Sequence, residues 1–336
     1  MKAKALIGII ALLSLATGIA ACGSSDESGP ITVYSGREEE LVAPLFERYE
    51  EETGNEVEVR YGDSAELAAT ILEEGENTPA DVFFSQDAGA LGALEKEGRF
   101  SVLDEDVVDL VDTRYRSPDG RWVGTSGRAR VIAYDSRELS ESDLPDSVLD
   151  LTEPEWEGRI GWAPTNGSFQ AFVTALRLSE GDEAAREWLE AMDDNGTEAF
   201  ADNSSIRDAI AAGEIDLGLI NHYYVAQAQA EEGTDYPVEV HFPRGGDVGA
   251  LVNVAGAGIL AASDQQDAAG EFVAFLLSPK TQQYFAEETK EYPLIEGVKA
   301  DPRVVPLKEI EQPRIDLSNL DDLQGSLTVI EESGAL

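Results

Sequence analysis

The 336-residue chain has very few of the side chains that build disulfides, zinc sites and common catalytic centres. It holds one cysteine, Cys22, and two histidines, His222 and His241. A single cysteine excludes an internal disulfide and leaves no thiol set for zinc. The sequence also lacks an HExxH motif, a Cys–His zinc spacing and a recognisable Ser-His-Asp arrangement. We therefore do not expect an enzyme.

Basic residues are also scarce. The chain has 24 Lys and Arg against 67 Asp and Glu, which gives a formal net charge of −43. Such a charge repels phosphate backbones, so nucleic acid is not an expected partner. The acids gather on helix faces, as in 50–52, and a solvated surface explains them better than a specific acidic site. The negative electrostatic potential of such a chain would attract a cationic ligand.

Long apolar runs are confined to the N-terminus. Residues 5–20 are apolar but too short to span a bilayer comfortably, and 19–23 (IAACG) resemble a bacterial lipobox. We predict a lipoprotein signal at 1–22 and a flexible tether at 23–30, with a lipid anchor on Cys22. The domain would then sit on the outer face of the cytoplasmic membrane. An ordinary secretory signal with a chance cysteine is the alternative.

Strand and helix patterns alternate through the first part of the remaining chain. Three such units in a row predict a parallel sheet with helices on both faces. Ligands of such sheets bind at the carboxyl ends of the strands. The strand patterns lie at 31–35, 56–61 and 80–84, and the helix patterns at 38–53, 64–74 and 87–97, with Ser64 as an expected N-cap.

A second group of elements indicates a second lobe. A strand at 128–134 could cross into it and one at 250–254 could cross back. We therefore predict an α/β clamshell of two lobes, with two crossover strands at the hinge and a cleft between the lobes. The predicted lobes comprise residues 31–127 with 253–302, and residues 128–252 with 303–336. We expect a monomer.

Two adjacent tyrosines, Tyr223 and Tyr224, stand where an apolar strand gives way to a helix. At a helix start neighbouring side chains diverge by about 100°, so both phenol oxygens could reach one point. Only a strongly acidic metal ion would remove the protons of phenols whose pKa is near 10. The alternative is a pair of half-buried aromatic residues on an amphipathic helix.

Three helix starts in the predicted second lobe carry small polar residues that could bind an anion. They contain Asn166, Gly167 and Ser168, then Asn203, then Asn221. Free N–H groups and the helix dipole favour an oxyanion there. Routine N-caps are the alternative for each, but together the starts could frame a small oxyanion beside a metal.

Several short motifs lie along the chain from Ile31 to about Leu294. They are VYSG at 33–36, PADVF at 79–83, SGRARV at 126–131, RIG at 159–161, PTNG at 164–167, NS at 203–204, NHYY at 221–224, GALV at 249–252 and EYPL at 291–294. In this order and spacing they resemble the ferric-ion-binding proteins, the solute receptors of bacterial iron ABC importers. This resemblance implies a type II periplasmic-binding-protein fold, Fe(III) as cargo and an ABC permease as partner.

The resemblance also implies roles for individual residues. Tyr223 and Tyr224 match the tyrosines that are the main iron ligands in that family. A phosphate or carbonate completes the coordination there, held by the turn that matches residues 166–168 and by asparagines that match Asn203 and Asn221. Fe(III) is a hard ion that prefers anionic oxygen, which agrees with this assignment.

The chain departs from the family pattern at the first lobe. Many members have His where this chain has Glu38, and Glu where it has Gln86, followed by Asp87. Glu38 is a competent oxygen ligand that could replace the His, or it could be a first-turn acid that favours the helix dipole. Gln86 is a poor ligand for Fe(III), so we expect a shallower or wetter site on this side.

Other polar residues are weaker candidates. Arg37, Arg128 and Arg130 could pair with the anion or bridge the lobes, with surface salt bridges as the alternative. Tyr61, at the end of the second strand, is an outside candidate for the metal. Of the two histidines, the one before the tyrosines is a weak candidate ligand, and the other is expected to be structural.

Two other classes of function remain possible from the sequence. A receptor for a bare oxyanion such as sulfate would use the same helix starts without needing two phenols. A tethered sensory domain would fit the fold, but the chain has no signalling segment. Metal dependence of ligand binding would separate the first alternative from an iron receptor.

Overall fold

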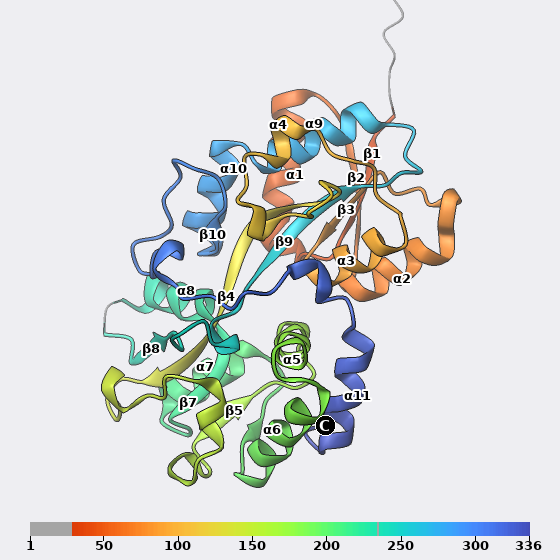
Figure 1. The fold of residues 1–336 in the computed structure, drawn as a ribbon. Helices are drawn as coiled ribbons and strands as arrows, with labels where there is room; N and C mark the ends of the chain where they lie inside the picture. The colour runs from red at the N-terminus through yellow and green to blue at the C-terminus, as the bar shows by residue number, and fades with distance from the viewer. Residues whose placement is uncertain (1–28, 234) are drawn as a thin grey trace, which may run out of the picture.

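The computed structural model describes residues 29–233 and 235–336, and it shows two lobes joined by long strands (Figure 1). In the first lobe the central strand pairs in parallel with a strand on each side, and each strand leads into a helix. This is the predicted arrangement of three strand–helix units. They are β1 (Ile31–Ser35), β2 (Val57–Tyr61) and β3 (Val82–Ser85) with α1 (Glu39–Thr53), α2 (Ser64–Glu74) and α3 (Ala88–Lys96).

Local sequence explains how these helices begin and end. Val42, Leu45, Phe46 and Tyr49 recur at helical spacing on α1 and are buried, and each such side chain contributes about 1.5–3 kcal/mol. The helix ends at Gly54, whose φ of 78° places it in the left-handed region.

The N-cap of α2 differs from the expectation. Asp63, not Ser64, caps the helix, and its carboxylate accepts from the N–H groups of Ala65 and Glu66 at 2.8 and 3.2 Å. The Ser64 hydroxyl instead accepts from the N–H of Gln86 at 2.9 Å. The prediction of Ser64 as cap is therefore wrong, because a carboxylate one residue earlier reaches the same N–H groups.

Two strands run from one lobe to the other: β4 (Val123–Asp135) and β9 (Val252–Ile259). They pair antiparallel at the centre of a sheet whose order is β2-β1-β3-β9-β4-β7-β5-β6, and β10 and β8 also pair with β4. The first half of β4, up to Ala129, lies against β9, whereas from Arg130 onward it lies against β7. The chain therefore passes from the first lobe to the second at residues 129–130 of β4.

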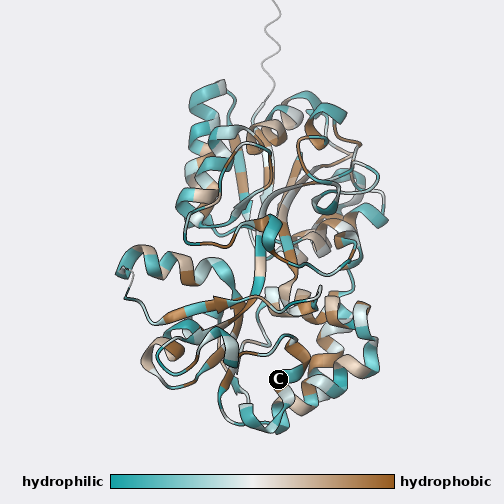
Figure 2. Cartoon of the chain, turned by 60° about the vertical axis from the view of Figure 1, so that its left-hand side comes forward, coloured by the Kyte–Doolittle hydropathy of each residue, from teal (hydrophilic) through white to brown (hydrophobic). Residues whose placement is uncertain are grey.

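The second lobe repeats the parallel pattern, with β5 flanked by β6 and β7. Its core contains the aromatic side chains of Trp162, Phe169, Phe172 and Trp188, whose rings lie 5.6–6.5 Å apart. The elements are β5 (Ile160–Trp162), α5 (Gly167–Glu180), α6 (Asp182–Asp194), β6 (Glu198–Ala199), α7 (Asn203–Ala212), β7 (Leu217–Asn221), α8 (His222–Glu232) and β8 (Val238–His241). Figure 2 shows hydrophobic strands inside both lobes and hydrophilic helix faces outside.

The chain returns to the first lobe after β9. After residue 284 the chain forms a π-helical turn, η7 (Phe285–Thr289). A short strand, β10 (Tyr292–Pro293), then pairs with β4 at Ser126 and Gly127. The other helices of this lobe are α4 (Glu105–Val108), α9 (Gln266–Leu276) and α10 (Pro279–Tyr284).

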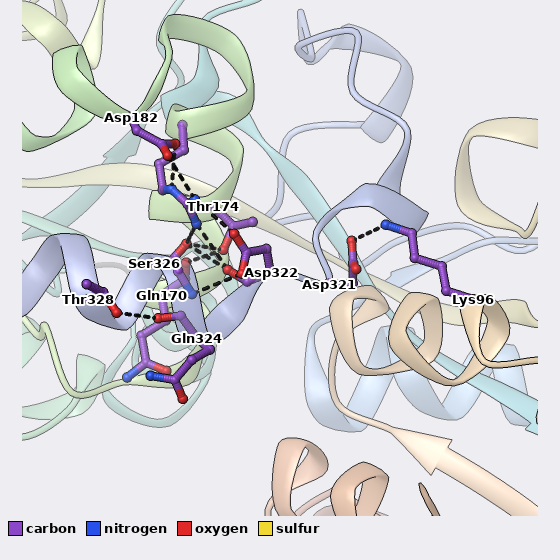
Figure 3. Close-up of polar contacts among 11 residues, drawn as sticks. Lys96, Gln170, Thr174, Asp182, Asp321, Asp322, Gln324, Ser326 and Thr328 are labelled. Carbon is purple, nitrogen blue, oxygen red and sulfur yellow. Dashed lines mark hydrogen bonds and ion pairs between the residues drawn. The ribbon is translucent and has the colours of Figure 1, made fainter.

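The C-terminal segment contacts both lobes in turn. The turn η9 (Leu317–Asn319) packs on α3, and α11 (Leu323–Ser333) packs on α5 and α6. Asp321 pairs with Lys96 of α3 at 2.5 Å, whereas its neighbour Asp322 lies in a polar cluster beside α5 (Figure 3).

Among the described residues, no helix is long and apolar enough to cross a membrane. The predicted lipoprotein signal and Cys22 lie outside the described residues.

Candidate cation and anion site

A cavity of about 250 Å³ lies between the lobes, beside the point at which β4 passes from one lobe to the other. It receives side chains from both lobes and from the hinge strands. Its lining consists of Gly36, Glu38, Asp63, Ser64, Gln86, Asp87, Arg128, Arg130, Asn166, Gly167, Ser168, Asn221, Tyr223, Tyr224, Leu251 and Asn253.

The two tyrosines stand together in this cavity. They occupy the first turn of α8, directly after β7 ends at Asn221. Their rings are stacked, with centroids 4.3 Å apart and an angle of 28° between the planes. Tyr223 is only 4% exposed, whereas Tyr224 is half-buried. The strand-to-helix junction thus points both phenols in one direction, as the sequence predicts.

The surroundings hold both phenols in the protonated form when the cavity is empty. Burial raises the pKa of Tyr223 well above its ordinary value, and the neighbouring Tyr224 raises it further. Burial also raises the pKa of Tyr224; its hydrogen bond with Tyr223 lowers this pKa, and the Glu38 carboxylate raises it. A ligand that needs phenolate oxygen must therefore displace both protons.

Two buried arginines border the phenols. Arg128 and Arg130 are 3% and 4% exposed. They lie two residues apart on β4, so both side chains point to the same face of the strand. Arg130 donates to the carbonyl oxygen of Leu219 at 2.8 Å, and Arg128 donates to the carbonyl oxygen of Gln86. Within the described residues neither guanidinium forms an ion pair, and the Arg128 Nε has no partner.

This uncompensated positive charge is costly in a buried place. Burial lowers the pKa of Arg130 to about 10, and the two neighbouring phenols counteract that shift. A protein with a net charge of −43 thus keeps, within its described residues, two guanidinium groups without ion-pair partners beside the phenols. An anion is the ligand that such groups favour.

The helix starts of the second lobe add N–H donors to this side. Asn166 caps α5 and accepts from the N–H and hydroxyl of Ser168 at 3.1 and 2.5 Å. Asn203 does not line the cavity itself; its amide donates to Asn166 Oδ1 at 3.2 Å. Asn221 precedes α8, makes no capping bond, and accepts from Arg130 at 3.5 Å. The start of α7 is capped by Asp202.

The first lobe contributes three acids, one after each of its parallel strands. Asp63 and Asp87 use carboxylate oxygens to cap α2 and α3. Burial raises the pKa of Asp87. Glu38 precedes α1 but makes no capping bond, and it is exposed. Among the three, Glu38 is therefore the carboxylate with both oxygens free of helix capping. Gln86 lies beside them with its buried Oε1 unpartnered.

Like Asn203, the sequence candidates Arg37 and Tyr61 lie outside the cavity lining. Arg37 is 2% exposed and forms an ion pair with Glu291 at 2.9 Å, so its charge is already compensated. Tyr61 packs edge-on against Phe46 of α1 at 6.4 Å between ring centroids. Neither side chain reaches the phenols in this structure.

Both histidines have structural partners. The His222 Nδ1 accepts from the N–H of Ala129 at 3.1 Å, and its Nε2 lies 3.1 Å from the carbonyl oxygen of Lys290. His241 Nε2 lies 2.9 Å from the carbonyl oxygen of Pro145. Neither ring lines the cavity.

Sequence reasoning about single residues did not select five residues of the lining: Gly36, Asp63, Ser64, Leu251 and Asn253. Three of them lie at the carboxyl ends of β1 and β2, the sheet edge at which ligands were expected. Asn253 gives no local signal, because its role depends on a non-local contact: its amide oxygen accepts from the N–H of Ala88 at 3.2 Å.

A larger cavity of about 480 Å³ lies between residues 113–118 and 312–317 and shares Leu251 with the tyrosine cavity. Its buried phenol, Tyr115, is hydrogen-bonded to Gln312. We take the smaller cavity as the site because it combines paired phenols with buried cations. In residues 29–233 and 235–336, no three His, Cys, Asp or Glu side chains are grouped so that they could hold a metal ion.

Comparison with known proteins shows which family the sequence matches. Residues 77–317 match the family described as "Bacterial extracellular solute-binding protein". The chain is 33% identical to the "Fe(3+)-binding periplasmic protein" of Serratia marcescens, over 98% of each chain.

Solved structures agree with this match. The iron-bound HitA of Pseudomonas aeruginosa superposes with a TM-score of 0.84 at 32% identity, over 91% of this chain and 100% of that one. A Trichodesmium protein (IdiA, FutA) in complex with iron and citrate gives 0.79 at 27% identity, over 91% and 99%. The predicted periplasmic-binding-protein fold is confirmed by these structures.

Proposed function

The chain belongs to the ferric iron-binding family of bacterial extracellular solute-binding proteins, and we propose that it captures Fe(III) together with an oxyanion between its lobes. The carrying observation is the stacked pair Tyr223 and Tyr224 in a cavity that both lobes line. Phenolate is a hard anionic ligand of the kind that Fe(III) prefers. A solute-binding protein of this kind delivers its cargo and does not transform it.

A charge argument supports the oxyanion. A trivalent ion with two phenolates leaves one surplus positive charge, and Arg128 and Arg130 add one each. Glu38 removes one, whereas the Asp63 and Asp87 carboxylates are already engaged by the N–H groups of α2 and α3. The two guanidinium groups without ion-pair partners in the described residues are therefore the local charges that an oxyanion would compensate. Phosphate and carbonate fit the helix starts at Asn166, Gly167, Ser168 and Asn221, with Asn203 behind them. The citrate bound with iron in the Trichodesmium protein indicates that a small carboxylate is a further candidate.

Titration of purified protein with Fe(III), with and without phosphate or carbonate, tests this proposal. We expect a visible phenolate-to-iron charge-transfer band, and weaker iron binding in the anion-free buffer. An Arg128→Gln variant should lose most of the anion effect, because it removes an unpaired buried charge. Equal affinity in both buffers would show that protein ligands or water close the site instead.

Glu38 is proposed as the ligand from the first lobe. It faces Tyr224 closely enough to raise the pKa of that phenol, and it caps no helix. Glu38→Gln should weaken iron binding and leave the melting temperature of the iron-free protein nearly unchanged, because the side chain is exposed.

Glu39→Gln is the matched control, since Glu39 is also exposed and acidic but does not line the cavity. Unaltered iron affinity in Glu38→Gln would leave Glu38 as an acid that only favours the dipole of α1.

In this proposal Gln86 and Asp87 line the cavity on the first-lobe side. Arg37 and Tyr61 lie outside the lining and are not proposed as ligands. The lobes are proposed to divide as predicted, at 31–127 with 253–302 and at 128–252 with 303–336. We further propose a lipid anchor on Cys22, which would hold the receptor at the outer face of the cytoplasmic membrane, and delivery to an ABC permease.

A receptor for a bare oxyanion is the second candidate function. The two unpaired buried arginines favour it independently of the tyrosines. Binding of phosphate or sulfate with unchanged affinity in the absence and presence of iron, and no visible band, would support this candidate over the iron receptor.

A further inference from the structure

The segment Thr289–Tyr292 has two unusual backbone features that the cavity does not explain. It begins with the last residue of the π-helical turn η7, a rare form that is frequently found at functional sites. Lys290 has a φ of 61°, and among the described residues it alone takes a positive φ without being glycine. Such strain persists only where surrounding contacts fix it. The segment also includes the start of the EYPL motif at 291–294, to which the proposed function gives no role.

On one side the segment holds the residue before the tyrosine pair. Because His222 Nδ1 accepts from the N–H of Ala129, its Nε2 carries the proton and donates to the carbonyl oxygen of Lys290 at 3.1 Å. The imidazole ring is buried and stacks on Tyr292, with centroids 4.3 Å apart and planes at 17°. The start of α8 is thus fixed between the hinge strand and this segment.

A second side chain of the same helix repeats the contact. Gln227 donates from its amide to the carbonyl oxygen of Thr289 at 3.1 Å. Two successive carbonyl groups of the segment therefore receive donors from α8. Because β10 pairs with the first-lobe half of β4, these bonds join the tyrosine helix to the first lobe.

On the other side the segment holds the residue before Glu38. The Glu291 carboxylate accepts from Arg37 Nη2 at 2.9 and 3.0 Å and from the Ser126 hydroxyl at 2.6 Å. The side chains of Arg37 and Glu291 are 0% and 1% exposed. The carboxylate therefore fixes the loop that carries Glu38 to the hinge strand.

We propose that Thr289–Tyr292 is a positioning element that sets the tyrosine pair and Glu38 relative to one another, through His222 and Arg37. This inference rests on the proposed iron site. The partners touch the residues adjacent to the ligands in sequence, and none of them lines the cavity. Outer partners of this kind orient metal ligands, and their loss typically lowers metal affinity about 10–100-fold.

Two substitutions at His222 separate its two hydrogen bonds. In His222→Asn the amide oxygen can replace Nδ1 and keep the Ala129 contact, but the donor to Lys290 is lost. In His222→Gln the amide nitrogen can replace Nε2 and keep the Lys290 contact. We expect His222→Asn to weaken Fe(III) binding about 10–100-fold and to shift the charge-transfer band, and His222→Gln to restore both.

Two further variants test the rest of the element. Glu291→Gln should weaken iron binding without shifting the band, because it acts on the Glu38 side and not on the phenols. Gln227→Leu should shift the band in the same direction as His222→Asn, and it should fold readily because its side chain is only half-buried. It therefore keeps the test open if His222→Asn fails to fold.

His241→Asn is the matched control, since it removes a comparable contact to the carbonyl oxygen of Pro145. It should lower the melting temperature and leave the band and the iron affinity unchanged. Folded His222→Asn, Gln227→Leu and Glu291→Gln proteins with wild-type affinity and an unshifted band would overturn the positioning role alone. Absence of iron binding in the wild-type protein would overturn the proposed function, and this inference with it.

Discussion

A protein in which Tyr223 and Tyr224 are both replaced by phenylalanine is expected to lose its visible absorption band and almost all of its ferric iron. The change removes two anionic oxygens and keeps the ring volume, so the stacked pair at 4.3 Å should survive. The loss should exceed the roughly 10–100-fold effect of removing an outer partner of a metal site, because these are the proposed ligands themselves. Competition with a chelator of known iron affinity measures it.

The same variant should fold as well as the wild type. Without iron the phenols are protonated, because burial raises both pKa values, so removal of their hydroxyl groups should change stability by only about 1 kcal/mol. Tyr115→Phe is a suitable control because Tyr115 is 3% exposed, close to the 4% of Tyr223, and lines the other cavity. A double variant that binds iron like the wild type would refute tyrosinate ligation.

The order of strands and helices was largely predictable, because the spacing of apolar residues along the chain differs between strands and helices. The strand at 31–35 coincides with β1, and the apolar stripe on 38–53 marks the buried face of α1. Local patterns did not identify the correct residue where two neighbours could play one role, as Asp63 and Ser64 could at the N-cap of α2. They also missed the π-helical turn after Tyr284, since nothing in that stretch distinguishes it from a continued helix.

The site was predictable to the extent that strand ends and helix starts carry it. Tyr223, Tyr224 and Asn166 fall at such junctions, and the structure brings them to one cavity. Arg37 could not be assigned in this way, because its partner Glu291 lies 254 residues further along the chain. The environment of His222 was equally hidden, since its two partners come from β4 and from the loop before β10.

Iron affinity is expected to fall steeply as the pH falls. The phenols are protonated in the empty protein, and burial holds both pKa values above the ordinary value of 10. The bound form is deprotonated, so each iron releases two phenolic protons, and acid favours the empty form. Carboxylates are generally ionised at neutral pH and release none.

The expected slope is up to about two log units of affinity per pH unit. Because both phenol pKa values lie above the range of measurement, the slope should not flatten between about pH 5 and pH 8. Protonation of a bound phosphate or carbonate would steepen it further. An iron titration against a competing chelator at several pH values, corrected for the protonation of the chelator, measures this slope. A flat response would exclude tyrosinate ligation.

Release should also open the lobes if Glu38 joins the iron from the first lobe. The ion then bridges two bodies that otherwise meet across β4 and β9, and its loss removes the contact that favours the closed form. Small-angle scattering of the iron-loaded protein at neutral pH and of the acid-released protein should show a larger radius of gyration after release. Glu38→Gln should abolish that difference and keep most of the pH slope, because the phenols still supply the protons. A steep pH response in the wild type with an unchanged radius would retain the tyrosines as ligands and remove the bridge from the first lobe.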